Sequence, residues 1–373
     1  MILLATERDL LERALPGFDE RLAALGTDGA DDPDSGVVEE FRAAGGGNLL
    51  IPAGLGGAGL GCLEGVRLQR AVGSRAPALA VGSTMHHYKV AWLARELDGP
   101  VAASVLRRVA AERQLVASCG AEGRVGGSLF TPGIEVSALP DGLRISGTKR
   151  PCSLVRSMGL LSLLAAGPED SAYAGQLVNV LVPADAPGVS RQPFWRNRVL
   201  RAAQTDAVVL DGVHVADSMI VPVGLPSHSA QRITSNMLWF QLLITAAYLG
   251  VATGQVERLF RLDRGTAGDR IAALAPLESV AAALESAARE LDAGRCDDDL
   301  LGRVLLTRYT AQRAIAEATD RVLELLGGMA FVTGGEGAEA LLASRALAFH
   351  PPAESAMREP LDHWLRGDGL VLA

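Results

Sequence analysis

The spacing of apolar residues changes twice along this chain, and these two changes limit its possible folds most strongly. Up to about residue 114, leucine and alanine recur at helical spacing. From 115 to about 222 the spacing shortens to two, and Gly- or Pro-containing turns separate short runs such as 142–146 and 177–182. Helical spacing then returns, in segments near 229–262, 269–293, 298–326 and 336–348.

This order predicts an α+β protein of three domains. Residues 1–114 form an N-terminal helical domain, with helices expected over 3–25, 37–44, 63–73, 78–97 and 100–113. Residues 115–222 form a compact antiparallel β-barrel or sandwich, because six or more short strands follow one another without intervening helices. Residues 223–373 form a C-terminal four-helix bundle.

Charge and cysteine content exclude several classes of protein. The net charge of −8 and the lack of a dense basic run disfavour a nucleic-acid partner. The four cysteines have no CxxC or Cys/His ligand spacing, so we expect small, unpaired, buried residues in a reducing compartment. The first residues lack the apolar region of a signal peptide, and no run of about 18 uninterrupted apolar residues occurs. These features predict a soluble cytoplasmic protein.

Three short motifs limit the possible folds further. Residues 51–60, IPAGLGGAGL, resemble the IPxxxGGxGL loop of the acyl-CoA dehydrogenase superfamily. Residues 147–153, GTKRPCS, resemble its GxKxWIT segment, and 326–331, LGGMAF, resemble its LGGxGY turn. The motifs occur in the family's order, so the resemblance covers the whole chain. It implies the family's α, β, α fold with a central β-barrel, and FAD as the cofactor.

The resemblance also implies which residues contact the flavin. Ser153 takes the position of the Thr that lies beside the flavin, while Pro151 replaces the neighbouring Trp. Glu122 and Ser128 match the family's TE motif and the following Gly-Ser turn, although Ala121 lacks the expected hydroxyl. The alternative interpretation of Ser153 is a simple turn residue.

Gly327 and Gly328 match the turn near the flavin diphosphate. Glycine lets the backbone approach a phosphate and donate N–H groups to it. The alternative interpretation of these glycines is a helix C-cap.

The catalytic base is less evident. A thioester dehydrogenase needs a carboxylate of raised pKa above the substrate α-carbon. In most of the family this is the Glu of an EGT motif, which this chain lacks. Aligning Arg345 with the family Arg puts Glu354 at that position, whereas aligning the preceding helix on Glu339 puts Pro352 there. Glu354 is therefore a candidate base, and its alternative interpretation is a solvent-facing carboxylate at a helix N-terminus.

His350 is the second candidate. A neutral imidazole beside the flavin moves a proton near pH 7, but a His before Pro-Pro also serves to cap and pack. Some relatives carry the Glu on the first bundle helix; here residues 229–249 contain no acid.

Three functions follow from the resemblance. The first is an FAD-dependent dehydrogenase of an acyl thioester on CoA or acyl carrier protein, which abstracts the α-proton, transfers hydride to flavin N5 and passes electrons to an acceptor. Phe240 and Trp239 would then lie at the floor of the acyl pocket. The second is a flavin-dependent monooxygenase of the same fold that uses reduced flavin and oxygen. The third is a degenerate member kept as a binding subunit. The family also suggests a homodimer or homotetramer through the C-terminal bundle.

Overall fold

The computed structural model describes residues 2–120, 122, 132–224, 230–332 and 336–372. Six N-terminal helices precede the strands: α1 (Ala5–Ala14), α2 (Phe18–Ala30), α3 (Val37–Ala43), α4 (Cys62–Gly73), α5 (Pro77–Leu93) and α6 (Pro100–Glu112). The single helix expected over 3–25 is wrong in detail, because the chain turns at Leu15–Gly17, where Gly17 has a φ of 78°. The other N-terminal helices lie close to their expected positions.

The described residues of the β-region form two four-stranded sheets. Their strands are β1 (Leu115–Ser118), β2 (Glu135–Leu139), β3 (Gly142–Cys152), β4 (Met158–Ala166), β5 (Leu177–Pro183), β6 (Val189–Gln192), β7 (Asp206–Ala216) and β8 (Ile220–Gly224). One sheet has the order β1-β4-β5-β8 and the other β2-β3-β7-β6. All pairs are antiparallel except β1 with β4. That pair is parallel because the chain crosses to the second sheet as β2 and β3 before it returns as β4.

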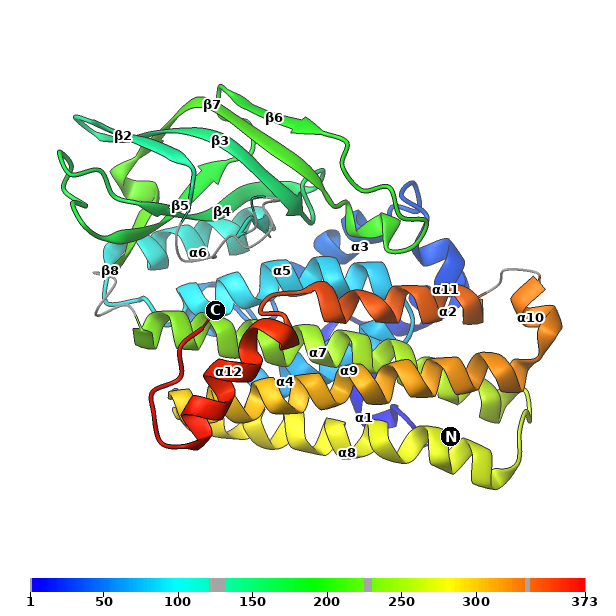
Figure 1. Cartoon of the computed structure of the whole chain (residues 1–373). Helices are drawn as coiled ribbons and strands as arrows, with labels where there is room; N and C mark the ends of the chain where they lie inside the picture. Colours follow the sequence, from blue (N-terminus) through cyan, green and yellow to red (C-terminus); the bar gives the residue numbers. More distant parts are fainter. Residues whose placement is uncertain (1, 121, 123–131, 225–229, 333–335, 373) are drawn as a thin grey trace.

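The C-terminal region is again helical. It contains α7 (Ala230–Arg261), α8 (Ala267–Asp292), α9 (Asp298–Leu326), α10 (Gly328–Val332), α11 (Glu336–Ser344), the 3₁₀ turn η5 (Arg345–Phe349) and α12 (Glu354–Leu365). Figure 1 shows the sheets lying over α5 and α6, with the long bundle helices beneath them. The predicted order of helical, β and helical regions is thus confirmed. The last N-terminal helix ends at Glu112, the first strand begins at Leu115, and β8 ends at Gly224. The division into domains at 114 and 222 stays a prediction.

Helix α7 forms the centre of the structure because small residues let other helices approach it. A Cβ at Gly73 of α4 would lie 2.1 Å from the Ala247 carbonyl oxygen, and one at Gly250 would lie 2.2 Å from that of Arg70. The backbones of α4 and α7 therefore touch, and only glycine fits at these two positions. This contact ties the N-terminal helices to the bundle.

Among the described residues, two helices are long and apolar enough to cross a membrane by length and composition alone: Gln231–Arg261 and Ala267–Asp292. In the first, 94% of the most apolar window is buried inside the protein, as in the core helix of a globular fold. In the second, within α8, the buried share is 33%.

The structure corrects the expectation for two cysteines. Cys119, just after β1, and Cys152, at the end of β3, form a disulfide with a Cα–Cα distance of 5.2 Å. They are 33 residues apart, so their meeting depends on strand pairing and leaves no local spacing signal. Cys62 and Cys296 are free, and Cys62 is buried as expected.

Candidate active site

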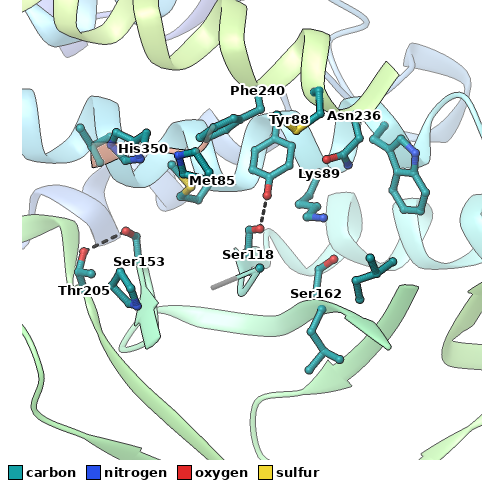
Figure 2. Close-up of a pocket in the computed structure, with 18 of the residues that line it drawn as sticks. Met85, Tyr88, Lys89, Ser118, Ser153, Ser162, Thr205, Asn236, Phe240 and His350 are labelled. Atoms are coloured by element: carbon teal, nitrogen blue, oxygen red, sulfur yellow. Dashed lines mark hydrogen bonds between the residues drawn. The ribbon is translucent and has the colours of Figure 1, made fainter. Parts of the chain in front are cut away.

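A cavity of about 470 Å³ lies between the helices and the β-region. Its walls come from α5, β1, β4, α7 and the segment that follows α11, so segments far apart in sequence meet there (Figure 2). Most lining side chains are apolar, including Met85, Trp195 and Phe240. The few polar groups among them decide what the cavity can bind.

His350 lies at one end of this cavity. Its Nε2 is 3.1 Å from the Tyr248 hydroxyl, and the Phe240 ring stands edge-on to the imidazole with centroids 6.0 Å apart. Burial, with a smaller contribution from the positive charge of Arg308, lowers the pKa of His350 to about 3. The ring is therefore neutral near pH 7. Within the described part of the chain its Nδ1 has no hydrogen-bond partner, so this atom is open to a ligand.

Arg308 of α9 holds the backbone around His350 in place. This fully buried guanidinium donates to the carbonyl oxygens of Leu347, Pro351 and Pro352 at 3.0, 3.1 and 3.2 Å, and also to that of His350. It donates as well to Gln241 Oε1 at 2.7 Å. These bonds satisfy backbone carbonyls of a segment that belongs to no α-helix or β-strand. The conformation of the His-Pro-Pro turn is therefore set by a helix about 40 residues earlier in the chain.

Two pairs of hydroxyl groups line the cavity, and their free hydrogens bear on whether a flavin fits there. Ser153 Oγ lies 2.9 Å from Thr205 Oγ1, and the Tyr88 hydroxyl bonds to Ser118 Oγ. In each pair, one of the two hydroxyl hydrogens forms the bond between the partners. No acceptor for the other hydroxyl hydrogen is found among the described residues. Each pair can thus donate one hydrogen bond to a bound molecule. A flat apolar ring with a polar edge, as in a flavin, suits such a cavity.

A third polar group faces the cavity from the sheet β1-β4-β5-β8. Ser162 Oγ of β4 donates to Asn179 Oδ1 of β5 at 2.9 Å. Asn179 is 2% exposed, and its Nδ2 has no partner among the described residues. A buried amide N–H₂ without an acceptor is costly unless a ligand accepts its hydrogen bonds.

Two cations also line the cavity. Arg232 forms an ion pair with the buried Glu96 at 3.0 Å. Lys89 of α5 points from the helix toward β4 in Figure 2, and desolvation lowers its pKa to about 8. No Asp or Glu is among the described residues that line the cavity.

The structure does not bring Glu354 to the cavity. Glu354 is the first residue of α12, and its carboxylate accepts hydrogen bonds from Arg313 at 3.0 and 3.1 Å. The turn at Pro351 and Pro352 directs α12 away, so the residue that the match on Arg345 proposed as the base is outside the cavity lining. The position of Glu354 agrees with the alternative interpretation of a carboxylate at a helix N-terminus. Trp239, expected as a floor, is also outside the lining, whereas Phe240 belongs to it.

The other predicted flavin residues are distributed differently. Ser153 lines the cavity. Glu122 lies just outside the lining, where it accepts from Lys149 Nζ at 2.6 Å and from the backbone N–H of Gly133. Gly327 and Gly328 lie at the far end of α9, where Gly327 is the helix C-cap with a φ of 89°. Ser128 lies outside the described residues. The roles of all five residues in flavin binding stay predictions.

Lys89, Tyr248 and Arg308 were not singled out from the sequence. Lys89 carries a detectable signal: it is one of only two lysines in a chain with 35 basic residues, and it interrupts an apolar helix. Tyr248 and Arg308 carry none, since aromatic residues and arginines are common on packed helices.

Comparisons with known proteins agree with this fold. No family model matches the chain. Isobutylamine N-hydroxylase from Streptomyces viridifaciens is 36% identical over 377 residues, which cover 99% of both chains. Among solved structures, KijD3 in complex with dTDP is 20% identical with a TM-score of 0.83, covering 98% of this chain and 97% of that one. FMN-bound TdsC from Paenibacillus is also 20% identical, with a TM-score of 0.81, covering 100% of this chain and 99% of that one.

Proposed function

Since the chain belongs to the acyl-CoA dehydrogenase superfamily, and within it to the family of isobutylamine N-hydroxylase, we propose that it is a flavin-dependent N-hydroxylase of a primary amine. The observation that carries this proposal is the 36% identity over 99% of both chains. The site supports it, because a histidine lines the cavity, whereas no carboxylate of the kind that a thioester dehydrogenase requires is among the described lining residues. These two observations favour the monooxygenase over the dehydrogenase that we placed first from the sequence.

We propose a flavin as the cofactor, with FAD predicted from the family motifs and FMN as the form to test beside it. When bound in its reduced form, the flavin supplies two electrons and two protons to dioxygen, so that one oxygen atom enters an N–H bond of the amine and the other leaves as water. Ser153 and Thr205 have one hydroxyl hydrogen left to donate to the polar edge of the ring. Glu122, Ser128, Gly327 and Gly328 remain the proposed outer contacts of the cofactor.

The residues of the chain then have three tasks. His350, neutral at pH 7, accepts or donates a proton at Nδ1 while Tyr248 fixes the ring through Nε2. Phe240 and Met85 keep water from the reacting atoms by filling the walls with apolar surface. Arg308 fixes the turn that carries His350.

The test is to load the purified protein with FAD or FMN, reduce the flavin with a separate reductase, and add oxygen with isobutylamine, butylamine or pentylamine. We expect a product heavier by one oxygen atom, which carries label from isotopically labelled dioxygen. The same protein with oxidised flavin is mixed anaerobically with short acyl thioesters. Flavin bleaching by a thioester, together with no oxygenated amine, would overturn the proposal and restore the dehydrogenase.

Histidine and glutamate variants sharpen the assignment. In His350→Gln we expect oxygenated amine to fall by about 10²-fold or more, as is usual on removal of a proton-transfer group. Glu354→Gln is the matched control, because it removes a carboxylate of the same segment that lies outside the cavity. A larger loss in Glu354→Gln than in His350→Gln would contradict these roles.

We also infer a homodimer or homotetramer formed through the C-terminal bundle. Helix α8 supports this inference, since it is apolar enough to cross a membrane but only 33% of its most apolar window is buried, and Ile271 is 56% exposed. Light scattering after gel filtration tests it, and Ile271→Glu should weaken the association.

A further inference from the structure

Lys89 is a cation of the cavity that has no counter-charge. Its side chain reaches from α5 between Ser118 and Ser162 in Figure 2. Within the described residues, its Nζ has neither a carboxylate nor a hydrogen-bond acceptor. Its nearest compensation comes from aromatic rings, since Nζ lies 5.0 Å from the ring centre of Tyr88 and 5.7 Å from that of Trp92. Cation–π contacts offset only part of the cost of removing an ammonium from water.

The second cation of the cavity is already neutralised. Arg232 Nε lies 3.0 Å from Glu96 Oε2, and its Nη1 donates to the Pro222 carbonyl at 2.7 Å. The described lining contains no acid, so the cavity keeps one uncompensated positive charge when Lys89 is protonated. A pKa of about 8 leaves Lys89 mostly protonated at pH 7.

Further hydrogen-bond donors line the same cavity as Lys89. Asn179 Nδ2 is buried and unpartnered on β5, and Ser162, its neighbour on β4, lies below Lys89 in Figure 2. The Tyr88 and Ser118 pair has one hydroxyl hydrogen left to donate. Several donors and one cation around a single space are what a carboxylate, with two oxygens and one negative charge, satisfies.

His350 and Ser153 lie at the opposite end of the view in Figure 2, with Tyr88 between them and Lys89. The two ends therefore offer different chemistry: proton transfer beside the proposed flavin site, and anion binding beside Lys89. We infer that Lys89 forms a carboxylate subsite, and that the amine substrate is an amino acid whose carboxylate binds there while its amino group extends toward His350. This inference rests on the proposed amine hydroxylation and names its substrate class.

The electrostatics of a plain alkylamine are less favourable here. An alkylammonium entering the cavity meets a like charge on Lys89 and no acid among the described lining residues. An amino acid brings the missing negative charge itself. The carboxylate subsite thus selects substrates by supplying a counter-charge that the protein lacks.

Lysine labelling gives a direct test of this contact. Because the chain has only Lys89 and Lys149, protein grown with ¹⁵N-lysine has two side-chain signals, and Lys89→Met assigns them. The oxidised-flavin protein is titrated with pH alone, and then with valine, γ-aminobutyrate or δ-aminovalerate. We expect at least one amino acid to raise the pKa of Lys89 by about one unit or more, and the corresponding amines, isobutylamine, butylamine and pentylamine, to leave it unraised.

Substrate specificity gives the second test. For each amino acid and its matched amine, kcat/KM is measured for oxygenation in the wild type, Lys89→Met and Lys89→Arg. We expect the ratio of amino acid to amine to fall about 30-fold or more in Lys89→Met, as for the loss of a desolvated charge contact, and to recover partly in Lys89→Arg. Lys89→Glu should instead favour the diamine putrescine over γ-aminobutyrate.

The outcomes separate the two proposals. Oxygenated amines without any preference for amino acids, and an unchanged Lys89 signal, would overturn the carboxylate subsite and leave the N-hydroxylase intact. A raised pKa of Lys89 with no oxygenated product from any substrate would support the subsite and overturn the N-hydroxylase. A specificity ratio in Lys89→Met equal to that of the wild type would also overturn the subsite.

Discussion

Replacing Arg308 by methionine tests how the fold holds the active-site turn. Methionine keeps much of the volume but removes five hydrogen bonds from a charged donor, four of them to backbone carbonyls between Leu347 and Pro352. At about 1.5–3 kcal/mol for each bond with a charged partner, a simple sum gives an upper bound. The desolvation of the buried charge, which lowers the pKa of Arg308 to about 10, offsets part of that sum.

The expected net loss in the free energy of unfolding is about 3–5 kcal/mol, the range for breaking a buried charged contact. For a chain of 373 residues, about 1.3 °C per kcal/mol gives a fall in Tm of roughly 4–6 °C. Thermal and urea unfolding measure it, and amide hydrogen exchange of residues 347–350 should rise before that of α9. Arg313→Met on the same helix is the control, since it loses only the surface ion pair with Glu354, worth less than about 1 kcal/mol. Equal losses in the two variants would refute the clamping role of Arg308.

Three other predictions follow from described contacts. The pKa values of His86, His87 and His350 are lowered to about 3, 4 and 3, chiefly by burial, so unfolding takes up protons below pH 6.5. Each histidine should therefore lower the free energy of unfolding by about 2 kcal/mol at pH 5 relative to pH 7.5. A free energy of unfolding that does not change with pH, measured by urea unfolding, would contradict this. Tyr248→Phe, which removes the hydroxyl at 3.1 Å from His350 Nε2, should lower kcat for amine oxygenation by about tenfold with little change in KM, and an unchanged kcat would argue against ring positioning. Titration of denatured, unreduced protein with a thiol reagent should find two thiols, from Cys62 and Cys296, whereas four thiols would contradict the disulfide.

Local sequence signals were sufficient for most of the fold. Helical spacing and the glycines between segments gave α4, α7 and α9 to within a few residues, because those elements are decided by which faces are buried. The two changes of spacing gave the order of regions for the same reason. The break at Gly17 was missed, since leucines continue at helical spacing on both sides of it.

The site was less predictable because it depends on contacts between distant segments. Ser153 was identified from a family motif and His350 as a candidate proton carrier, and both line the cavity. Glu354 is only four residues from His350 but points elsewhere, because Arg308 and the Pro-Pro turn decide the path of the chain. The disulfide of Cys119 and Cys152 likewise depends on strand pairing, which no local pattern records.

The cavity has walls from α5 through to Pro351, so it exists only when nearly the whole chain is assembled. A molecule bound there has no affinity for a partly folded chain, and at 100 times its Kd it adds about 2.7 kcal/mol to the stability of the assembled one. Chains that have captured their cofactor should therefore survive proteases longer than empty ones. The supply of cofactor would then set the abundance of the protein as well as its activity.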